Sequence, residues 1–226
     1  MARGGPQLAH GHAPPGGQPG AAQGFDINKG GNDKGAPSTG NKYFSPYNNP
    51  RLKNGPDGEY LPERLATETS QFIRENKSKP FFAMLSFYSV HTPLMTTKAL
   101  EEKYLAKRAK MGLEDKFEPE HANQNRITQA HAVYAGMVEA MDQAVGTVLD
   151  EIEKQGLAEN TIIVFFSDNG GLSTAEGSPT SNLPLRAGKG WLYEGGIREP
   201  LIIKWPNTIK AGSVNTTPVI SNDFYA

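Results

Sequence analysis

The chain of 226 residues contains no cysteine. It therefore cannot form a disulfide, and the redox state of its compartment cannot be inferred from this sequence. It also lacks any apolar run approaching the ~18 residues that cross a bilayer as a helix, which predicts no membrane span. Its formal net charge is only −1. Such a small charge gives no electrostatic basis for binding nucleic acid or an anionic membrane.

The N-terminal segment, residues 1–23, consists mainly of Gly, Pro, Ala, Gln and His. It offers almost nothing to bury, so burial cannot offset the entropy of ordering it, and we predict that it is disordered. The composition changes abruptly after Gln23. We therefore expect one folded domain over residues 24–226, which is long enough to bury a substantial core.

The rest of the chain alternates apolar runs with amphipathic segments. From Gly24 to Asp57 we expect a long irregular segment held by aromatic side chains and lining a substrate cleft. Regular elements are predicted as helices over 60–77, 97–118 and 127–155 and as strands over 81–90, 162–166 and 201–203. The long helix is expected to bury a face formed by Val133, Met137, Met141, Ala144, Val148 and Ile152. Residues 24–226 should thus form an α/β layer structure.

The stretch from Thr161 to Pro200 carries most of the chemistry. Its first part, Ile162–Phe166, is β-branched and aromatic throughout, which is typical of a strand covered on both faces, as in a parallel sheet. Asp168 and Asn169 follow the strand, at the carboxyl end where ligands of open α/β sheets bind. Their hard oxygens suit Ca²⁺ or Mg²⁺. We therefore identify this pair as candidate metal ligands.

Two further groups extend this candidate site. Lys189 lies between two glycines, which allow a loop to bring the ammonium close to an anion. His91 follows the apolar strand over 81–90, and we expect it at the same sheet edge as Asp168. A metal site formed by Asp168 and Asn169, with a lysine nearby, predicts a binding site for an oxyanion.

Two strings in this stretch are informative when taken together. F-F-S-D-N-G-G, which ends at Gly171, is followed by G-K-G-W-L-Y-E-G-G-I-R-E-P, which ends at Pro200. In this order and at this distance they closely resemble the type I sulfatases of the alkaline-phosphatase-like superfamily. S-F-Y-S-V-H-T-P, which contains His91, resembles another segment of that family. The resemblance extends from about Gly24 to the C-terminus and covers only part of the family domain.

The resemblance implies a partial alkaline-phosphatase-like domain, with a mostly parallel sheet flanked by helices. It implies metal-dependent hydrolysis of a small-molecule or carbohydrate sulfate ester, with Asp168 and Asn169 binding Ca²⁺ or Mg²⁺. Lys189 and His91 would contact the sulfate ester and act in its cleavage. The family also implies a periplasmic, secreted or lysosomal location.

Two features of the family are absent from this sequence. The family nucleophile is a formylglycine made from the Cys or Ser of a C/S-x-P/A-x-R motif, and the aspartate pair that completes the metal site lies near it. Neither is present, so we expect this chain by itself to be inactive. Two alternatives stay open, namely a phosphatase or phosphonate hydrolase of the same superfamily and a non-catalytic remnant. The G-K-x-x-x-x-E-G-G-x-R string from Gly188 to Arg198 favours the sulfatases over the phosphatases.

Other polar residues are interpreted as structural. Ser173 lacks the G-x-S-x-G setting of a nucleophile. Lys189 is preferred to Arg186 as the anion contact, and Arg198 is expected to form an ion pair. The remaining residues interpreted as structural are Glu139, Asp142, His121 and His131. His10 and His12 stand where the family has a K-W-H-x-G motif, and we interpret them as part of the unstructured tail.

Overall fold

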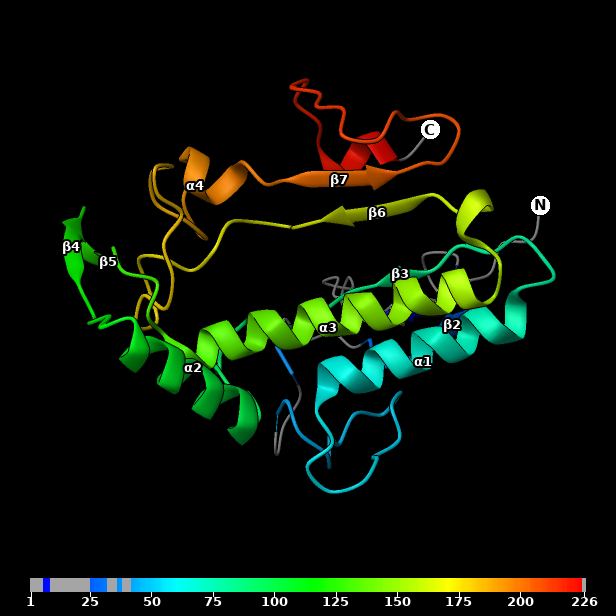
Figure 1. Cartoon of the computed structure of the whole chain (residues 1–226), viewed down its shortest axis with the longest axis horizontal. Coiled ribbons are helices and arrows are strands. Elements are labelled where there is room, and N and C mark those ends of the chain that lie inside the picture. The colour runs from blue at the N-terminus through cyan, green and yellow to red at the C-terminus, as the bar shows by residue number, and fades with distance from the viewer. Residues whose placement is uncertain (1–5, 9–24, 32–35, 38–41, 225–226) are drawn as a thin grey trace.

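The computed structural model describes residues 6–8, 25–31, 36–37 and 42–224 (Figure 1). Its elements are β1 (Pro6–Leu8), β2 (Ile27–Asn28), α1 (Leu61–Asn76), β3 (Met84–Leu85), α2 (Lys98–Lys110), β4 (Phe117–Glu120), β5 (Asn123–Arg126), α3 (Ala132–Lys154), β6 (Ile163–Phe166), α4 (Glu194–Ile197) and β7 (Leu201–Lys204). Short 3-10 turns cover Ala158–Asn160 and Ser221–Phe224. The predicted α/β class is confirmed. The predicted disorder of residues 1–23 is wrong for Pro6–Leu8, which form β1, and the rest of that segment lies outside the described residues.

The strands form one parallel sheet and two antiparallel pairs. β1 pairs in parallel with β2 on one side and β3 on the other, while β4 pairs with β5 and β6 with β7 in antiparallel fashion. The expectation that residues 162–166 are covered on both faces is wrong for this chain. Val164 and Phe165 are 45% and 38% exposed, because within the described residues β7 is the only strand that pairs with β6.

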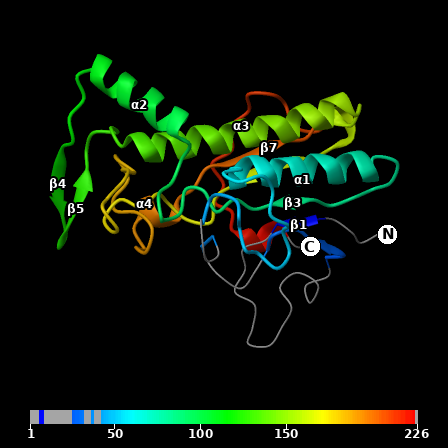
Figure 2. The ribbon, with the colours of Figure 1, turned by 90° about the horizontal axis from the view of Figure 1, so that it is seen from below.

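The helix α3 is the central element of the molecule. Figure 1 shows β6 and β7 on one side of it and α1 on the other, and Figure 2 shows α1 and α3 lying side by side. Met137, Ala144 and Ile152 are buried, which confirms the expected core face of this helix. A Schellman motif ends it, since Gly156 has a φ of +71° and Leu157 N–H donates to the carbonyl of Ile152 at 3.0 Å.

Residues 42–60 form an irregular segment that packs against α1. Tyr43 and Tyr47 are 0% and 2% exposed and belong to the same core cluster as Tyr60 and Met137. These two tyrosines therefore form part of the core instead of lining a cleft. Burial raises the pKa of Tyr43 far above its ordinary range, so this hydroxyl stays a neutral hydrogen-bond donor.

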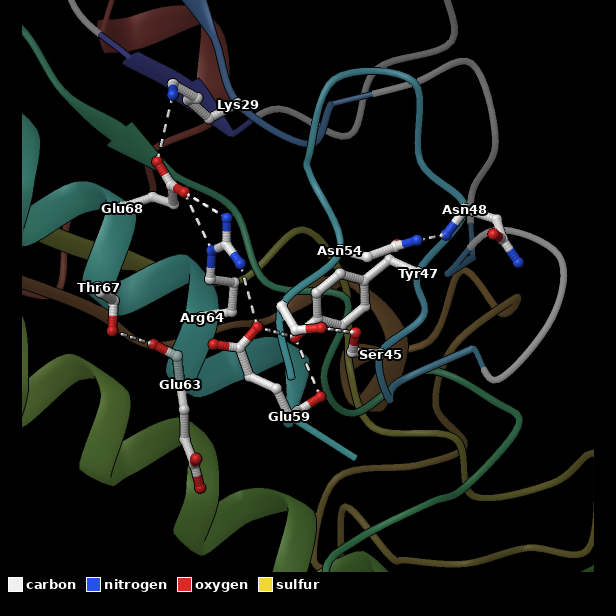
Figure 3. Close-up of polar contacts among 11 residues, drawn as sticks. Lys29, Ser45, Tyr47, Asn48, Asn54, Glu59, Glu63, Arg64, Thr67 and Glu68 are labelled. Carbon is white, nitrogen blue, oxygen red and sulfur yellow. Dashed lines mark hydrogen bonds and ion pairs between the residues drawn. The ribbon is translucent and has the colours of Figure 1, made fainter. Parts of the chain in front are cut away.

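Ion pairs hold this segment to the start of α1 (Figure 3). Arg64 lies 3.1 Å from Glu59 and 2.7 Å from Glu68, and Lys29 lies 3.3 Å from Glu68. Burial opposes ionisation of Glu68, but hydrogen bonds from Arg64 and the charge of Lys29 outweigh it and hold the pKa of that carboxyl below its usual value. The network fixes the direction in which the chain enters α1.

A hairpin replaces the last third of the predicted helix over 97–118. The helix α2 ends at Lys110, and Gly112 turns the chain with a φ of +60°. β4 and β5 follow, at the end of the molecule where α4 also lies (Figure 1). No residue of α2 is buried, which confirms the expected solvated helix. Within the described ranges, no helix combines the length and the apolar composition needed to cross a membrane.

Candidate oxyanion site

The turn after β6 places Asp168 and Asn169 at the carboxyl end of that strand, as predicted. Asp168 is exposed and Asn169 is half-buried. Ser167 Oγ donates to the carbonyl oxygen of Asn169 at 3.0 Å, which stabilises the turn. Both side chains end in oxygens of the kind that bind hard cations.

Lys189 is joined to this turn through its backbone. Its N–H donates to the carbonyl oxygen of Gly171 at 3.1 Å. Asn182 braces the same junction, because its Nδ2 donates to the carbonyl oxygens of Gly171 and Ala187, at 2.9 Å each. The structure thus connects the lysine loop to the Asp168–Gly171 turn, although seventeen or more residues separate them in sequence.

Two glycines are required for this close approach. A Cβ atom at Gly188 would lie 2.2 Å from the carbonyl oxygen of Gly171, and one at Gly170 would lie 1.7 Å from that of Gly195. Both separations are shorter than real Cβ atoms show. The glycine before Lys189 lets the lysine loop pack directly on the turn, a role that the sequence did not predict.

His91 is held by its backbone and by one ring nitrogen. Its N–H donates to the carbonyl of Tyr88 at 2.7 Å, and its own carbonyl accepts from Tyr43 Oη at 2.8 Å. Nδ1 lies 2.7 Å from the carbonyl oxygen of Thr92. A carbonyl oxygen only accepts, so Nδ1 carries the proton and Nε2 is the ring atom left for a ligand.

One contact links the His91 segment to the loop that follows the Asp168 turn. Thr92 Oγ1 donates to Glu176 Oε2, and Glu176 lies between the turn and Lys189 in the chain. Figure 1 shows β6 and the chain that follows β3 running toward the same end of the molecule. The prediction that His91 and Asp168 share one sheet edge is wrong, because the strands that precede them, β3 and β6, belong to different sheets. The four predicted site residues nevertheless come from segments that the fold brings to one end of the molecule. No contact between their side chains is recorded within the described ranges.

The side chains of Asp168, Asn169 and Lys189 have no hydrogen bond or ion pair with any residue that the structure describes. Polar groups of a fixed turn that are left unsatisfied by their own chain are available to an external ligand. Among the described residues, no group of three or more His, Cys, Asp or Glu side chains is arranged to hold a metal ion.

Sequence reasoning missed one acidic residue of this region, Glu199. Its Oε1 is buried and lacks a hydrogen-bond partner among the described residues. Burial, and next the charge of Asp168, raise the pKa of the Glu199 carboxyl above its usual value. The two carboxyl groups therefore share one environment, and a cation between them would offset the cost of bringing them together.

The β4–β5 hairpin braces the loop that carries Lys189. Glu120 Oε1 accepts from the N–H of Ala187 at 2.7 Å, and the buried Arg126 donates from Nε to the carbonyl of Ser178 at 3.0 Å. Ser178 Oγ donates to the carbonyl of Gln124 at 2.7 Å. These contacts set the position of the loop from outside the α/β layers.

Most residues that the sequence analysis set aside have structural contacts. Ser173 is 0% exposed, and its burial excludes it as an accessible nucleophile. Glu139 pairs with Lys103 at 2.7 Å, and Arg198 with Glu194 at 3.0 Å. His131 is the N-cap of α3 and accepts from the N–H of Tyr134 at 3.2 Å. Asp142 is exposed, and His10 and His12 lie outside the described residues.

A family model described as Sulfatase matches residues 11–226 of this chain. The chain belongs to the sulfatase family. Among its relatives, a sulfatase of Formosa agariphila is 40% identical over 189 residues, which cover 79% of this chain and 31% of that protein. Human steryl-sulfatase is 33% identical over 170 residues, which cover 73% of this chain and 25% of that protein. The sulfatase chain thus spans about a third or less of the length of these relatives.

Solved structures give the same fold for this sulfatase chain. The crystal structure of Ps i-CgsB in complex with k-i-k-neocarrahexaose is 28% identical, with a TM-score of 0.65, and the match covers 93% of this chain and 46% of that one. The crystal structure of yidJ from Bacteroides fragilis is 24% identical with a TM-score of 0.52, and it supports the fold alone. The expected alkaline-phosphatase-like class is confirmed, with this chain forming part of the domain.

Proposed function

We propose that this chain forms the part of a sulfatase that binds the sulfate group and stabilises its charge during hydrolysis of the ester. One observation carries the proposal. The loop bearing Lys189 is hydrogen-bonded and packed against the Asp168–Gly171 turn, while the side chains of Asp168, Asn169 and Lys189 have no partners among the described residues. A fixed backbone with unengaged charged groups is pre-organised for an anion and its counter-ion.

Lys189 acts on the developing charge. In sulfate ester hydrolysis, negative charge accumulates on the non-bridging oxygens and on the leaving oxygen. A positioned ammonium lowers the energy of that state without having to reorient. His91 offers Nε2 toward the ester, with its other ring nitrogen already held by the Thr92 carbonyl.

Asp168 and Asn169 are proposed as ligands of a divalent cation, Ca²⁺ or Mg²⁺. Their oxygens fit such an ion in kind, and the unpartnered Oε1 of Glu199 beside Asp168 adds a third donor of the same kind. These side chains alone supply too few oxygens to complete its coordination shell, since Ca²⁺ takes about six to eight oxygens. A divalent cation held by Asp168, Asn169 and Glu199 would polarise the sulfate oxygens and neutralise part of their charge.

The substrate class follows from the family. Relatives include a steryl-sulfatase and a structure bound to k-i-k-neocarrahexaose, so we propose a sulfate ester on a small molecule or a carbohydrate. The nucleophile expected from the family resemblance, a formylglycine, has no precursor motif in this sequence, and we propose that the chain by itself does not turn over. Export to the periplasm, the medium or a lysosome stays an expectation from the family.

The experiment uses a chimaera in which this chain is joined to the remaining part of the Formosa agariphila sulfatase. The Lys189→Ala variant should lower kcat for an aryl sulfate by about 10²–10³-fold, which corresponds to roughly 2.7–4 kcal/mol of lost transition-state stabilisation. Arg198→Gln, on the same segment but paired with Glu194, is the matched control and should leave kcat unchanged. A loss below tenfold in Lys189→Ala would contradict the assignment.

A further inference from the structure

Arg186, an arginine without a carboxylate partner, stands on the loop that carries Lys189. Five other arginines of the described chain pair with carboxylates, namely Arg64, Arg74, Arg108, Arg126 and Arg198. The recorded contacts of the Arg186 side chain are instead with the rings of His121 and Tyr193. Arg186 is exposed. Its charge is therefore available to an external anion.

Three rings beneath and beside this arginine are nearly parallel. The His121 centroid lies 4.6 Å from that of Trp191 and 5.4 Å from that of Tyr193, with interplanar angles of 11° and 15°. The Trp191 and Tyr193 centroids are 6.2 Å apart.

The guanidinium of Arg186 lies over the rings of Tyr193 and His121. Its Cζ is 3.9 Å from the Tyr193 centroid, and its Nη2 is 3.0 Å from His121 Nε2 and 3.5 Å from His121 Nδ1. An atom that is close to both ring nitrogens at once stands above the ring face, because in the ring plane it would overlap the carbon between them. Arginine guanidinium groups stack on aromatic faces in this way. Two contacts thus fix the plane of the guanidinium.

The platform itself is anchored. Trp191 Nε1 donates to Thr174 Oγ1 at 2.7 Å, and Glu120, the neighbour of His121, accepts from the N–H of Ala187 at 2.7 Å. The second oxygen of Glu120 is buried and has no hydrogen-bond partner among the described residues. We call His121, Arg186, Trp191 and Tyr193 the stacked platform.

We propose that Arg186 is a second anion subsite, which binds a sulfate or carboxylate on the sugar next to the one whose ester reaches Lys189. The inference rests on the proposed function and adds a preference for polyanionic carbohydrates. A guanidinium forms two parallel hydrogen bonds to a sulfate or carboxylate. Because the platform already fixes the side chain, binding costs less entropy. Lys189 is three positions after Arg186 in the chain, so their Cα atoms lie at most about 11 Å apart, a distance that favours two anions on one oligosaccharide.

The test compares three probes on the purified chain. They are a disaccharide sulfated on one sugar, the same disaccharide sulfated on both, and one that carries a sulfate and a uronate. The chain has two tryptophans, Trp191 and Trp205, so a Trp205→Phe background makes Trp191 the single fluorescent reporter inside the platform. Titration calorimetry gives the same dissociation constants independently.

The unsubstituted platform should bind the doubly sulfated probe about tenfold more tightly than the monosulfated one. Arg186→Gln should reduce this preference to less than about twofold, and Arg186→Lys should retain only part of it, because the planar fork is lost. His121→Ala should weaken the preference, since it frees the guanidinium. Arg198→Gln should match the unsubstituted chain. The uronate probe shows whether a carboxylate serves as well as a second sulfate.

Three results would overturn the proposal: equal affinity of the parent chain for the singly and doubly charged probes, a preference that survives in Arg186→Gln, or no binding of any probe at about 10 mM, weaker than an ordinary specific ligand. Failure of the proposed function is recognised separately. If Lys189→Ala leaves the affinity for the monosulfated probe unchanged, the primary sulfate site is wrong. Even in that case, a preference for the doubly sulfated probe that is lost only in the Arg186 variants would still support the second subsite.

Discussion

Asp168 and Glu199 lie at the same end of the β6–β7 pair. Phe166 and Leu201 are the last register partners there, and Asp168 follows Phe166 by two residues while Glu199 precedes Leu201 by two. Burial and the charge of Asp168 raise the pKa of Glu199, which agrees with this placement. Two acidic groups at one strand end destabilise the chain when no cation is bound.

Glu199→Gln should therefore stabilise the purified chain at pH 7 in the presence of a chelator, by up to about 1 kcal/mol because water screens part of the repulsion. The sign follows from the raised pKa. The ionised carboxylate is costly above the folded-state pKa, and the cost disappears as the pH falls through that value toward the unfolded one, near 4.3. The stabilisation should thus shrink between pH 7 and pH 4, as measured by urea unfolding. A variant less stable than the parent at pH 7 would contradict this account.

The contact between Glu120 and Ala187 is expected to position the lysine loop. Glu120→Ala removes the acceptor of the Ala187 N–H, which is buried, and should cost about 1–3 kcal/mol in unfolding free energy. Glu120→Gln keeps an acceptor oxygen at the same place and should cost less than half of that. Limited proteolysis supplies the local readout, since cleavage within residues 186–193 should accelerate in the Ala variant alone. Equal unfolding free energies and equal cleavage rates of Glu120→Ala and Glu120→Gln would exclude the positioning role.

Two glycine substitutions should have opposite effects. Gly188→Ala places a methyl group 2.2 Å from the Gly171 carbonyl oxygen, so the lysine loop must separate from the turn, at a cost of about 1–3 kcal/mol or more. Gly146→Ala is the matched control in α3, where a Cβ atom has no neighbour within 4 Å. It should raise stability by about 0.5–1 kcal/mol through helix propensity. Thermal unfolding measures the stability of both variants. A Gly188→Ala variant as stable as the parent chain would remove the argument for close packing.

The features predicted from sequence are those set by local chemistry. The helix over α1, the core face of α3 and its glycine cap follow from periodicity and capping, and the structure has them. The turn after β6 follows from Asp168, Asn169 and two glycines. These signals depend on neighbours in the chain, so they can be seen without a fold.

The features that were missed depend on partners distant in sequence. β5 reads N-Q-N-R and shows no apolar alternation, because its Arg126 is buried against Ser178 and Asp115 instead of in an apolar layer. Glu199 becomes a neighbour of Asp168 only through the antiparallel return of β7. Val164 and Phe165 looked like the centre of a covered sheet, but coverage depends on strands that pair with β6, which the run itself does not specify.

The chain itself should not hydrolyse sulfate esters. Covalent catalysis replaces one difficult step by two easier ones and requires the nucleophile, whose precursor motif this sequence lacks. Asp168, Asn169 and Glu199 provide only a few of the about six to eight oxygens that Ca²⁺ takes, so the cation would bind weakly and without fixed position. The assay uses the purified chain with an activated aryl sulfate and added Ca²⁺ or Mg²⁺, and the chimaera with the Formosa agariphila sulfatase serves as the positive control. We expect no turnover above the buffer rate. Multiple turnovers that disappear in Lys189→Ala would show that this chain reaches the ester by another nucleophile, such as a water activated within the site described here.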